Sequence, residues 1–169
     1  MNTAAQAVDK QATGEEAASQ YLTFMLAGEE YGVDIHKVQE IRCWEQPTML
    51  PNAINFVLGV INLRGTVVPI IDLRRRFGLE HGEFGPTTVV VVAKVSCADK
   101  DRVVGVVVDA VSEVYNVNDE QVRPAPDLGG AISTDFVKGL VTLGEKMIIL
   151  LDIDKLINAG LFKELDKQE

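Results

Sequence analysis

Residues 59–72 read Gly59-Val-Ile-Asn-Leu-Arg-Gly-Thr-Val-Val-Pro-Ile-Ile-Asp72, which predicts two antiparallel strands joined by a tight turn. The turn falls at Leu63–Thr66, where Gly65 supplies the positive φ that a third turn position requires. Arg64 is therefore expected at the exposed second position. Because Pro69 cannot donate a ladder hydrogen bond, the second strand is expected to lie at a sheet edge or to carry a bulge at this residue.

The same pattern returns later in the chain, at positions 139–153. In this Gly59/Gly139 alignment, Leu63 and Asp72 coincide with Leu143 and Asp152. A second block gives a Gly32/Gly105 alignment, in which Val38 and Glu40 coincide with Val111 and Glu113. Two blocks in the same order indicate an internal duplication. The two alignments differ in offset by seven positions, so the second half carries an insertion, which we expect within 124–134.

Composition excludes several classes of function. The chain has 169 residues, 47% hydrophobic residues and a net charge of −9, which is typical of a soluble globular protein. The negative charge disfavours nucleic-acid binding, since Arg74–Arg76 is the only concentrated basic run. Cys43, Cys97, His36 and His81 lack the spacing of a zinc site, so we expect neither a metal nor a cofactor.

No segment reaches the roughly 18 apolar residues of a membrane span. Residues 1–20 lack the basic start and apolar middle of a secretory signal, so a cytoplasmic protein is expected. The same residues contain little to bury and predict a disordered tail. The folded region is expected over 21–165.

Short runs of strand length dominate that region and predict an all-β fold with short helices. The expected strands are 21–26, 31–35, 59–63, 66–71, 87–95, 103–108, 136–143 and 146–151. Helical patterns are brief and fall at 37–43, 55–58, 73–77 and 153–159.

The two repeats, roughly 21–86 and 87–157 with the C-terminal helix, are each too small to bury a full core alone. We therefore expect two small antiparallel barrels packed over a shared core, with a groove at their junction.

Catalytic machinery is missing from the sequence. The stretch 139–146 resembles a phosphate-binding loop, but Glu145 separates its glycine from Lys146, so a hairpin turn is the better interpretation. Asp72 and Asp152 occupy equivalent places and suggest a carboxylate dyad as an alternative. In that case Asp72→Asn would abolish turnover. Each aspartate also precedes a short helical turn, which favours helix capping.

Arg64 and Glu40 are the candidate interaction residues. The counterpart of Arg64 is Gly144, so the hairpin itself does not require an arginine. Arginine is enriched at interaction hot spots, and this one protrudes from an acidic protein. Glu40 is expected on the short helix 37–43, beside Val38 and Ile41. Both charged residues could equally be solvated surface positions.

Three stretches together resemble the CheW family of bacterial chemotaxis coupling proteins. They are residues 59–74, residues 29–42 (Glu29-Glu-Tyr-Gly-Val-Asp-Ile-His-Lys-Val-Gln-Glu-Ile-Arg42) and residues 121–126 (Gln121-Val-Arg-Pro-Ala-Pro126). The resemblance covers roughly 21 to 165. It implies two intertwined five-stranded SH3-like barrels and a scaffold without catalytic activity or cofactor.

The resemblance also implies partners and a binding surface. The partners would be the cytoplasmic tips of methyl-accepting chemotaxis receptors and the regulatory domain of the histidine kinase CheA, with self-association in rings and recruitment to membrane receptor arrays. A receptor tip would insert into the groove between the barrels, while a separate barrel end holds the kinase. The implied binding residues are Ile35, Val38, Glu40, Ile41, Gly59, Asn62, Leu63 and Arg64.

Overall fold

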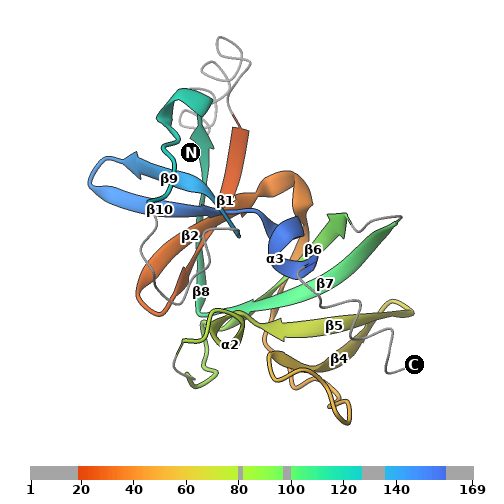
Figure 1. Ribbon diagram of the computed structural model, residues 1–169. Helices are drawn as coiled ribbons and strands as arrows, with labels where there is room; N and C mark the ends of the chain where they lie inside the picture. The colour runs from red at the N-terminus through yellow and green to blue at the C-terminus, as the bar shows by residue number, and fades with distance from the viewer. Residues whose placement is uncertain (1–18, 80–81, 97–99, 127–135, 159–169) are drawn as a thin grey trace, which may run out of the picture.

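The computed structural model describes residues 19–79, 82–96, 100–126 and 136–158 (Figure 1). Its strands are β1 (Ser19–Leu26), β2 (Glu29–Asp34), β3 (Val38–Cys43), β4 (Val57–Leu63), β5 (Thr66–Asp72), β6 (Val89–Ser96), β7 (Asp101–Val108), β8 (Ala110–Val117), β9 (Val137–Leu143) and β10 (Lys146–Leu151). Among the described residues, the short α-helices α2 (Leu73–Arg76) and α3 (Ile153–Asn158) follow β5 and β10, and 3-10 turns occupy Ile35–Lys37 and Asp119–Gln121. Within the described ranges, no helix has the length and apolarity to cross a bilayer.

The strands form two five-stranded sheets, as the resemblance to the CheW family implied. Sheet A has the order β8-β1-β2-β10-β9, and sheet B has the order β3-β6-β7-β5-β4. Figure 1 shows the two sheets stacked, with α3 lying between them. Most neighbouring strands are antiparallel, but β10 pairs with β2 and β5 pairs with β7 in parallel.

The duplication is visible in the pairing of strands. In sheet A, Gly32 of β2 lies opposite Leu150 of β10, and in sheet B Gly105 of β7 lies opposite Ile70 of β5. These pairs are equivalent under the two alignments read from the sequence. Strands β1 to β5 thus correspond to β6 to β10. Each sheet takes two strands from one half and three from the other, so the halves are intertwined.

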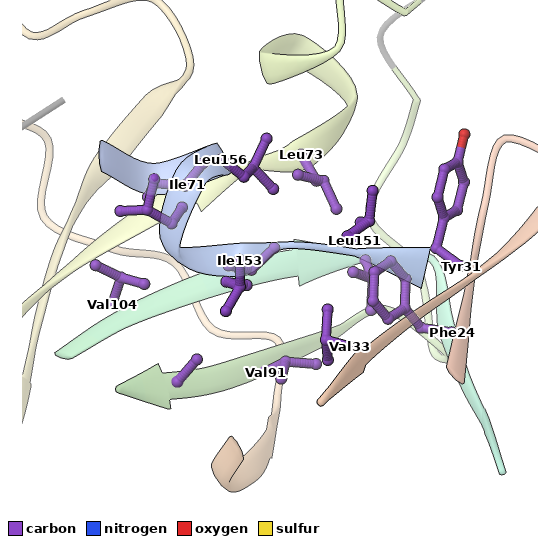
Figure 2. Close-up of a cluster of buried hydrophobic side chains, with 14 of the residues drawn as sticks. Phe24, Tyr31, Val33, Ile71, Leu73, Val91, Val104, Leu151, Ile153 and Leu156 are labelled. Atoms are coloured by element: carbon purple, nitrogen blue, oxygen red, sulfur yellow. The ribbon is translucent and has the colours of Figure 1, made fainter. Parts of the chain in front are cut away.

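A shared apolar core joins the two sheets. Phe24, Tyr31 and Val33 from sheet A pack in the same cluster as Ile71 and Val91 from sheet B. Figure 2 shows these side chains converging, with Ile153 and Leu156 of α3 covering them. Each sheet also encloses a smaller cluster of its own. Because burial of apolar surface contributes about 25 cal/mol per Å², this shared core is the main stabilising contact between the sheets.

One glycine in each sheet allows that sheet to close into a barrel. Past the edge strand β3, the backbone of Thr48 exchanges hydrogen bonds of 2.9 and 2.8 Å with Val60 of the other edge strand, β4. The equivalent exchange in sheet A joins Arg123 to Leu140, with both bonds at 2.8 Å. Gly59 and Gly139 precede the two bridge residues, and a Cβ on either would collide with the facing carbonyl group.

The local structure differs from the sequence prediction in three places. Residues 37–43 form the 3-10 turn and strand β3 instead of a helix, because β3 pairs along its length with β6. Residues 110–117 form β8, which no local pattern had indicated. Residues 55–56 are a turn, and residues 57–58 already belong to β4.

Pro69 was also misjudged. Strand β5 lies between β7 and β4, so it is an internal strand. Its parallel pairing with β7 starts at Ile70, one residue beyond Pro69, and the bulge lies in the partner strand β4 between Val57 and Gly59.

The start of β1 and the positions of the two helices agree closely with expectation. Strand β1 starts at Ser19, two residues earlier than the predicted start of order, and the rest of the tail lies outside the described residues. Helix α2 ends one residue before the predicted 73–77. Helix α3 ends at Asn158, and Ala159 lies outside the described residues.

Replacing either bridging glycine by alanine should destabilise the fold. We expect Gly59→Ala and Gly139→Ala each to cost more than about 1 kcal/mol, because the new Cβ overlaps backbone and Gly59 has a φ of +149°. Gly85→Ala is the control, since a Cβ there meets nothing within 4 Å. Urea unfolding measures all three. Equal midpoints would show that the sheets close without these two bridges.

Candidate protein-binding site

Arg64 stands at the tip of the β4–β5 hairpin in an unusual backbone conformation. Its φ is +52° and that of Gly65 is +90°. The positive φ of Gly65 was expected, but that of Arg64 was not. Two positive values define a mirror-image hairpin turn, whose twist matches that of the strands. The Oδ1 of Asn62 accepts a hydrogen bond of 2.9 Å from the backbone N–H of Gly65, which fixes the turn.

Glu40 connects this hairpin to β3. Its Oε1 accepts a hydrogen bond from Nη2 of Arg64 at 3.1 Å, and its Oε2 accepts one from Nη1 of Arg42 at 3.3 Å. Arg42 also donates to Glu45 at 3.3 Å. Four alternating charges therefore run across the end of sheet B. The side chain of Arg64 stays 68% exposed within this chain of charges, whereas that of Glu40 is 27% exposed.

The arginines shift the protonation of Glu40. The hydrogen bond from Arg64 is the largest cause that holds the pKa of Glu40 below its ordinary 4.5, with Arg42 acting in the same direction. The hydrogen bonds that Arg42 donates to Glu45 and Glu40 raise the pKa of Arg42. Since the pKa of Glu40 is lowered in the folded protein, the interaction is complete above pH 4.5 and is lost as the pH falls through the lowered value.

A shallow hollow of about 180 Å³ lies beside Arg64. It is bordered by Gln39 of β3, Thr66 at the start of β5 and Val103 of β7, with the buried Leu63 and Val68 beneath. Gln39 has no partner in the register between β3 and β6, which skips from Val38 to Glu40. This bulge turns Glu40 toward Arg64.

The other predicted site residues are placed differently. Gly59 and Leu63 are buried and serve the barrel itself. Ile35 and Val38 are half-buried and pack against the shared core. Ile41 is 44% exposed, but its neighbour Glu40 points to the other face of the strand, so the two do not form the expected pair. Of the eight predicted positions, the structure joins Arg64 and Glu40 directly, while Asn62 shapes the turn between β4 and β5.

Some exposed residues were missed. Met49 is 74% exposed, Val67 is 62% exposed and Met147 is 58% exposed. Val67 and Met147 coincide in the Gly59/Gly139 alignment, and this equivalence could have identified them. A hollow of about 450 Å³ lies beside Met147, bordered by Arg123, Pro124, Leu140 and Thr142. Both hollows lie at hairpins, whereas Figure 2 shows buried apolar side chains of the shared core between the sheets. A groove between the barrels stays a prediction.

The two equivalent aspartates are helix caps. Asp72 accepts from the backbone N–H of Arg74 at 3.1 Å, and Asp152 accepts from that of Lys155 at 3.1 Å. Both contacts satisfy N–H groups that the first turn of a helix leaves unpaired, so the capping prediction is confirmed. The described parts of the chain contain no cluster of acids, histidines and cysteines that would hold a metal.

Comparisons with known proteins agree with this architecture. The CheW-like domain model matches residues 20–160. The chain is 47% identical to a chemotaxis protein CheW of Klebsiella aerogenes over 146 residues, covering 86% of each chain. It is 33% identical to that of Bacillus subtilis, covering 90% of each. The chain belongs to the CheW-like family.

A solved structure supports the same assignment. The scaffolding protein TtCheW from Thermoanaerobacter tengcongensis superposes with a TM-score of 0.74 at 32% identity, covering 84% of this chain and 89% of that one. Together with the family match, this identifies the chain as a chemotaxis adaptor or scaffold.

The charges at the end of sheet B can be tested by titration. We expect Arg64→Gln to raise the pKa of Glu40 more than Arg42→Gln does, because the bond from Arg64 is the larger cause of the lowered value. NMR titration of the Glu40 side-chain carboxyl carbon measures both. An unchanged pKa in Arg64→Gln would show that the two side chains do not interact in solution.

Proposed function

We propose that this chain is a non-catalytic adaptor that couples the tips of methyl-accepting chemoreceptors to the regulatory domain of the kinase CheA, and that Arg64 is a central contact residue. Family membership supports the partners. The conformation of Arg64 is the single observation that supports its role.

Arg64 holds a backbone conformation that glycine would adopt at lower cost. A left-handed conformation costs a residue with a Cβ roughly 1–2 kcal/mol. In the equivalent turn of sheet A, Gly144 has a φ of +66°, so the fold accepts glycine at this place. Strain that the fold does not need points to function. The arginine gains an exposed guanidinium with five donors, fixed in direction by Glu40.

The partners are proposed to contact different surfaces. A receptor helix inserts apolar residues into a groove between the barrels, while Arg64 and Glu40 set its register. A separate barrel end holds the kinase domain, and contacts between barrel ends extend into rings. Because both partners bind one rigid body, each can change the affinity of the other, with a typical linkage of about 1–3 kcal/mol. Kinase activity is then controlled by binding alone.

Two further properties follow from the same proposal. The protein works in the cytoplasm and is recruited to membrane receptor arrays through its partners, without inserting into the membrane. Nucleic acid is not a partner, because the side chains of the basic run Arg74–Arg76 are hydrogen-bonded to other groups of the protein. Arg74 donates to Asp109 at 2.7 Å, Arg75 donates to the carbonyl oxygen of Asn55 at 3.0 Å, and Arg76 donates to that of Leu156 at 3.1 Å.

Arg64→Ala should weaken binding without unfolding the protein. We expect Kd for a receptor-tip fragment or for the CheA regulatory domain to rise about tenfold or more, as at an interface hot spot. The melting temperature should stay near that of the wild type, because the side chain is exposed. Lys94→Ala removes an exposed charge from β6 and is the matched control. Titration calorimetry with each partner separates the two contacts.

A charge exchange distinguishes direct contact from support of the turn. The double variant Arg64→Glu with Glu40→Arg retains an opposite-charge pair across β3 and the hairpin. If Arg64 contacts a partner, binding stays weak in this variant. Recovery of binding would show that the pair only holds the hairpin, and wild-type affinity in Arg64→Ala would remove Arg64 from the interface.

A further inference from the structure

Arg76, the last residue of α2, lies where the two halves of the chain meet. Its guanidinium carbon is 5.1 Å from the ring centre of Phe56 and 4.4 Å from that of Phe136. Nε and Nη2 of the same side chain donate to the carbonyl oxygen of Leu156 in α3, at 3.3 and 3.1 Å. One cation therefore contacts three separate segments.

The contacted residues are related by the duplication. Phe56 and Phe136 coincide in the Gly59/Gly139 alignment. Each is tied to the capping aspartate of its own half, since the N–H of Asp72 donates to the Phe56 carbonyl oxygen and that of Asp152 to the Phe136 carbonyl oxygen, both at 2.8 Å. Phe56 leads into β4 of sheet B, and Phe136 leads into β9 of sheet A.

The position of Arg76 breaks the symmetry of the repeat. In the same alignment its counterpart is Leu156, the residue whose carbonyl it binds. One repeat thus supplies a cation where the other repeat supplies an acceptor, and the cation lies between the two equivalent phenylalanine rings. This arrangement lies at the contact between the halves, since it joins Phe56 of the first half to Phe136 and Leu156 of the second.

The chemistry of this contact is directional. Burial lowers the pKa of Arg76, since its guanidinium has given up part of its water. Two ring faces and a carbonyl oxygen replace that water. Aliphatic side chains in the shared core hold the sheets together without defining one angle, because their attraction has no direction. A planar guanidinium between two rings and an acceptor permits far fewer orientations.

We propose that Arg76 is a positioning residue that fixes sheets A and B relative to each other and thereby carries the energetic coupling between a partner bound to one sheet and a partner bound to the other. The positioning role stands on the contacts of Arg76 alone. The coupling role rests on the proposed function.

Arg75 provides a matched control on the same helix. Its side chain bonds to the carbonyl oxygen of Asn55 and pairs with Asp72 at 3.5 Å. These contacts stay within the first half of the chain. Arg75→Met therefore makes the same chemical change one residue away without touching the contact between the halves.

The first experiment measures geometry in the free protein. Spin labels at Val67→Cys and Glu145→Cys, in a background where Cys43 and Cys97 are replaced by serine, report the distance between the β4–β5 and β9–β10 hairpins. We expect Arg76→Met to broaden this distance distribution and Arg75→Met to leave it unchanged. A distribution as narrow as that of the wild type in Arg76→Met would overturn the positioning role.

The second experiment measures coupling. The Kd of the CheA regulatory domain is determined without and with a saturating receptor-tip fragment, and the ratio is the coupling factor. We expect a factor of about 5 or more in the wild type and in Arg75→Met, falling to about 1 in Arg76→Met while both partners still bind.

The outcomes separate the two proposals. Failure of both partners to bind the wild type would overturn the proposed function and leave the distance measurement standing. A factor of 1 in the wild type, or an unchanged factor in Arg76→Met, would overturn the coupling role. If Arg76→Met does not fold, Phe136→Leu removes one ring face and keeps apolar volume. It should broaden the distance distribution and lower the coupling factor, and wild-type behaviour in it would refute the proposal.

Discussion

Both sheets depend on the parallel pairing of β2 with β10 and of β5 with β7. These pairings join strands from opposite halves of the chain, so neither sheet is complete until both halves are present. Each pairing runs through a glycine. A Cβ on Gly105 would lie 2.7 Å from side-chain atoms of both Ile70 and Val90, and one on Gly32 would lie 3.1 Å from Leu150. The close approach of these strands therefore depends on a glycine in each pairing as well as on the order of the strands.

Because the strands that cross between the halves form the core, the residues that stabilise the fold differ from those that are free to bind a partner. The strands that cross between the halves bury Tyr31, Val33, Ile71 and Val106 in the shared core, and little of that surface is left for a partner. The hairpins project from the outer ends of the same strands. A strained residue such as Arg64 is tolerated there, because the ladder on either side of the turn holds its backbone. A scaffold of this construction can change its contact residues without changing its core.

Much of the fold could be read from the sequence, because its hairpins, caps and repeat are local or periodic signals. Asp72 and Asp152 were identified as caps from the residues around them alone. Strand β3 was misread because the three-residue spacing of Val38 and Ile41 is that of a helix turn, whereas pairing with β6 holds the segment as a strand with a bulge at Gln39. The ion pair of Glu40 with Arg64 was not foreseen, since it depends on the bulge at Gln39 and on a contact between separate elements. Strand exchange between the halves could not be predicted from local patterns either, because the sequence of a single strand does not show which strand it pairs with.

The duplicated backbone carries different chemistry at its two ends. Where sheet B has Glu40 and Arg64 in contact with solvent, sheet A has Glu30 almost fully buried, accepting from Thr23 at 2.7 Å and paired with Lys146 at 3.5 Å. Lys146 also donates to the hydroxyl of Tyr115 at 3.1 Å. The exposed end of sheet B thus offers a guanidinium, whereas in sheet A Lys146 is paired with the buried Glu30 and the neighbouring Met147 is 58% exposed. Two ends with the same shape and different chemistry suit an adaptor, because identical ends would compete for one partner and unlike ends can hold two.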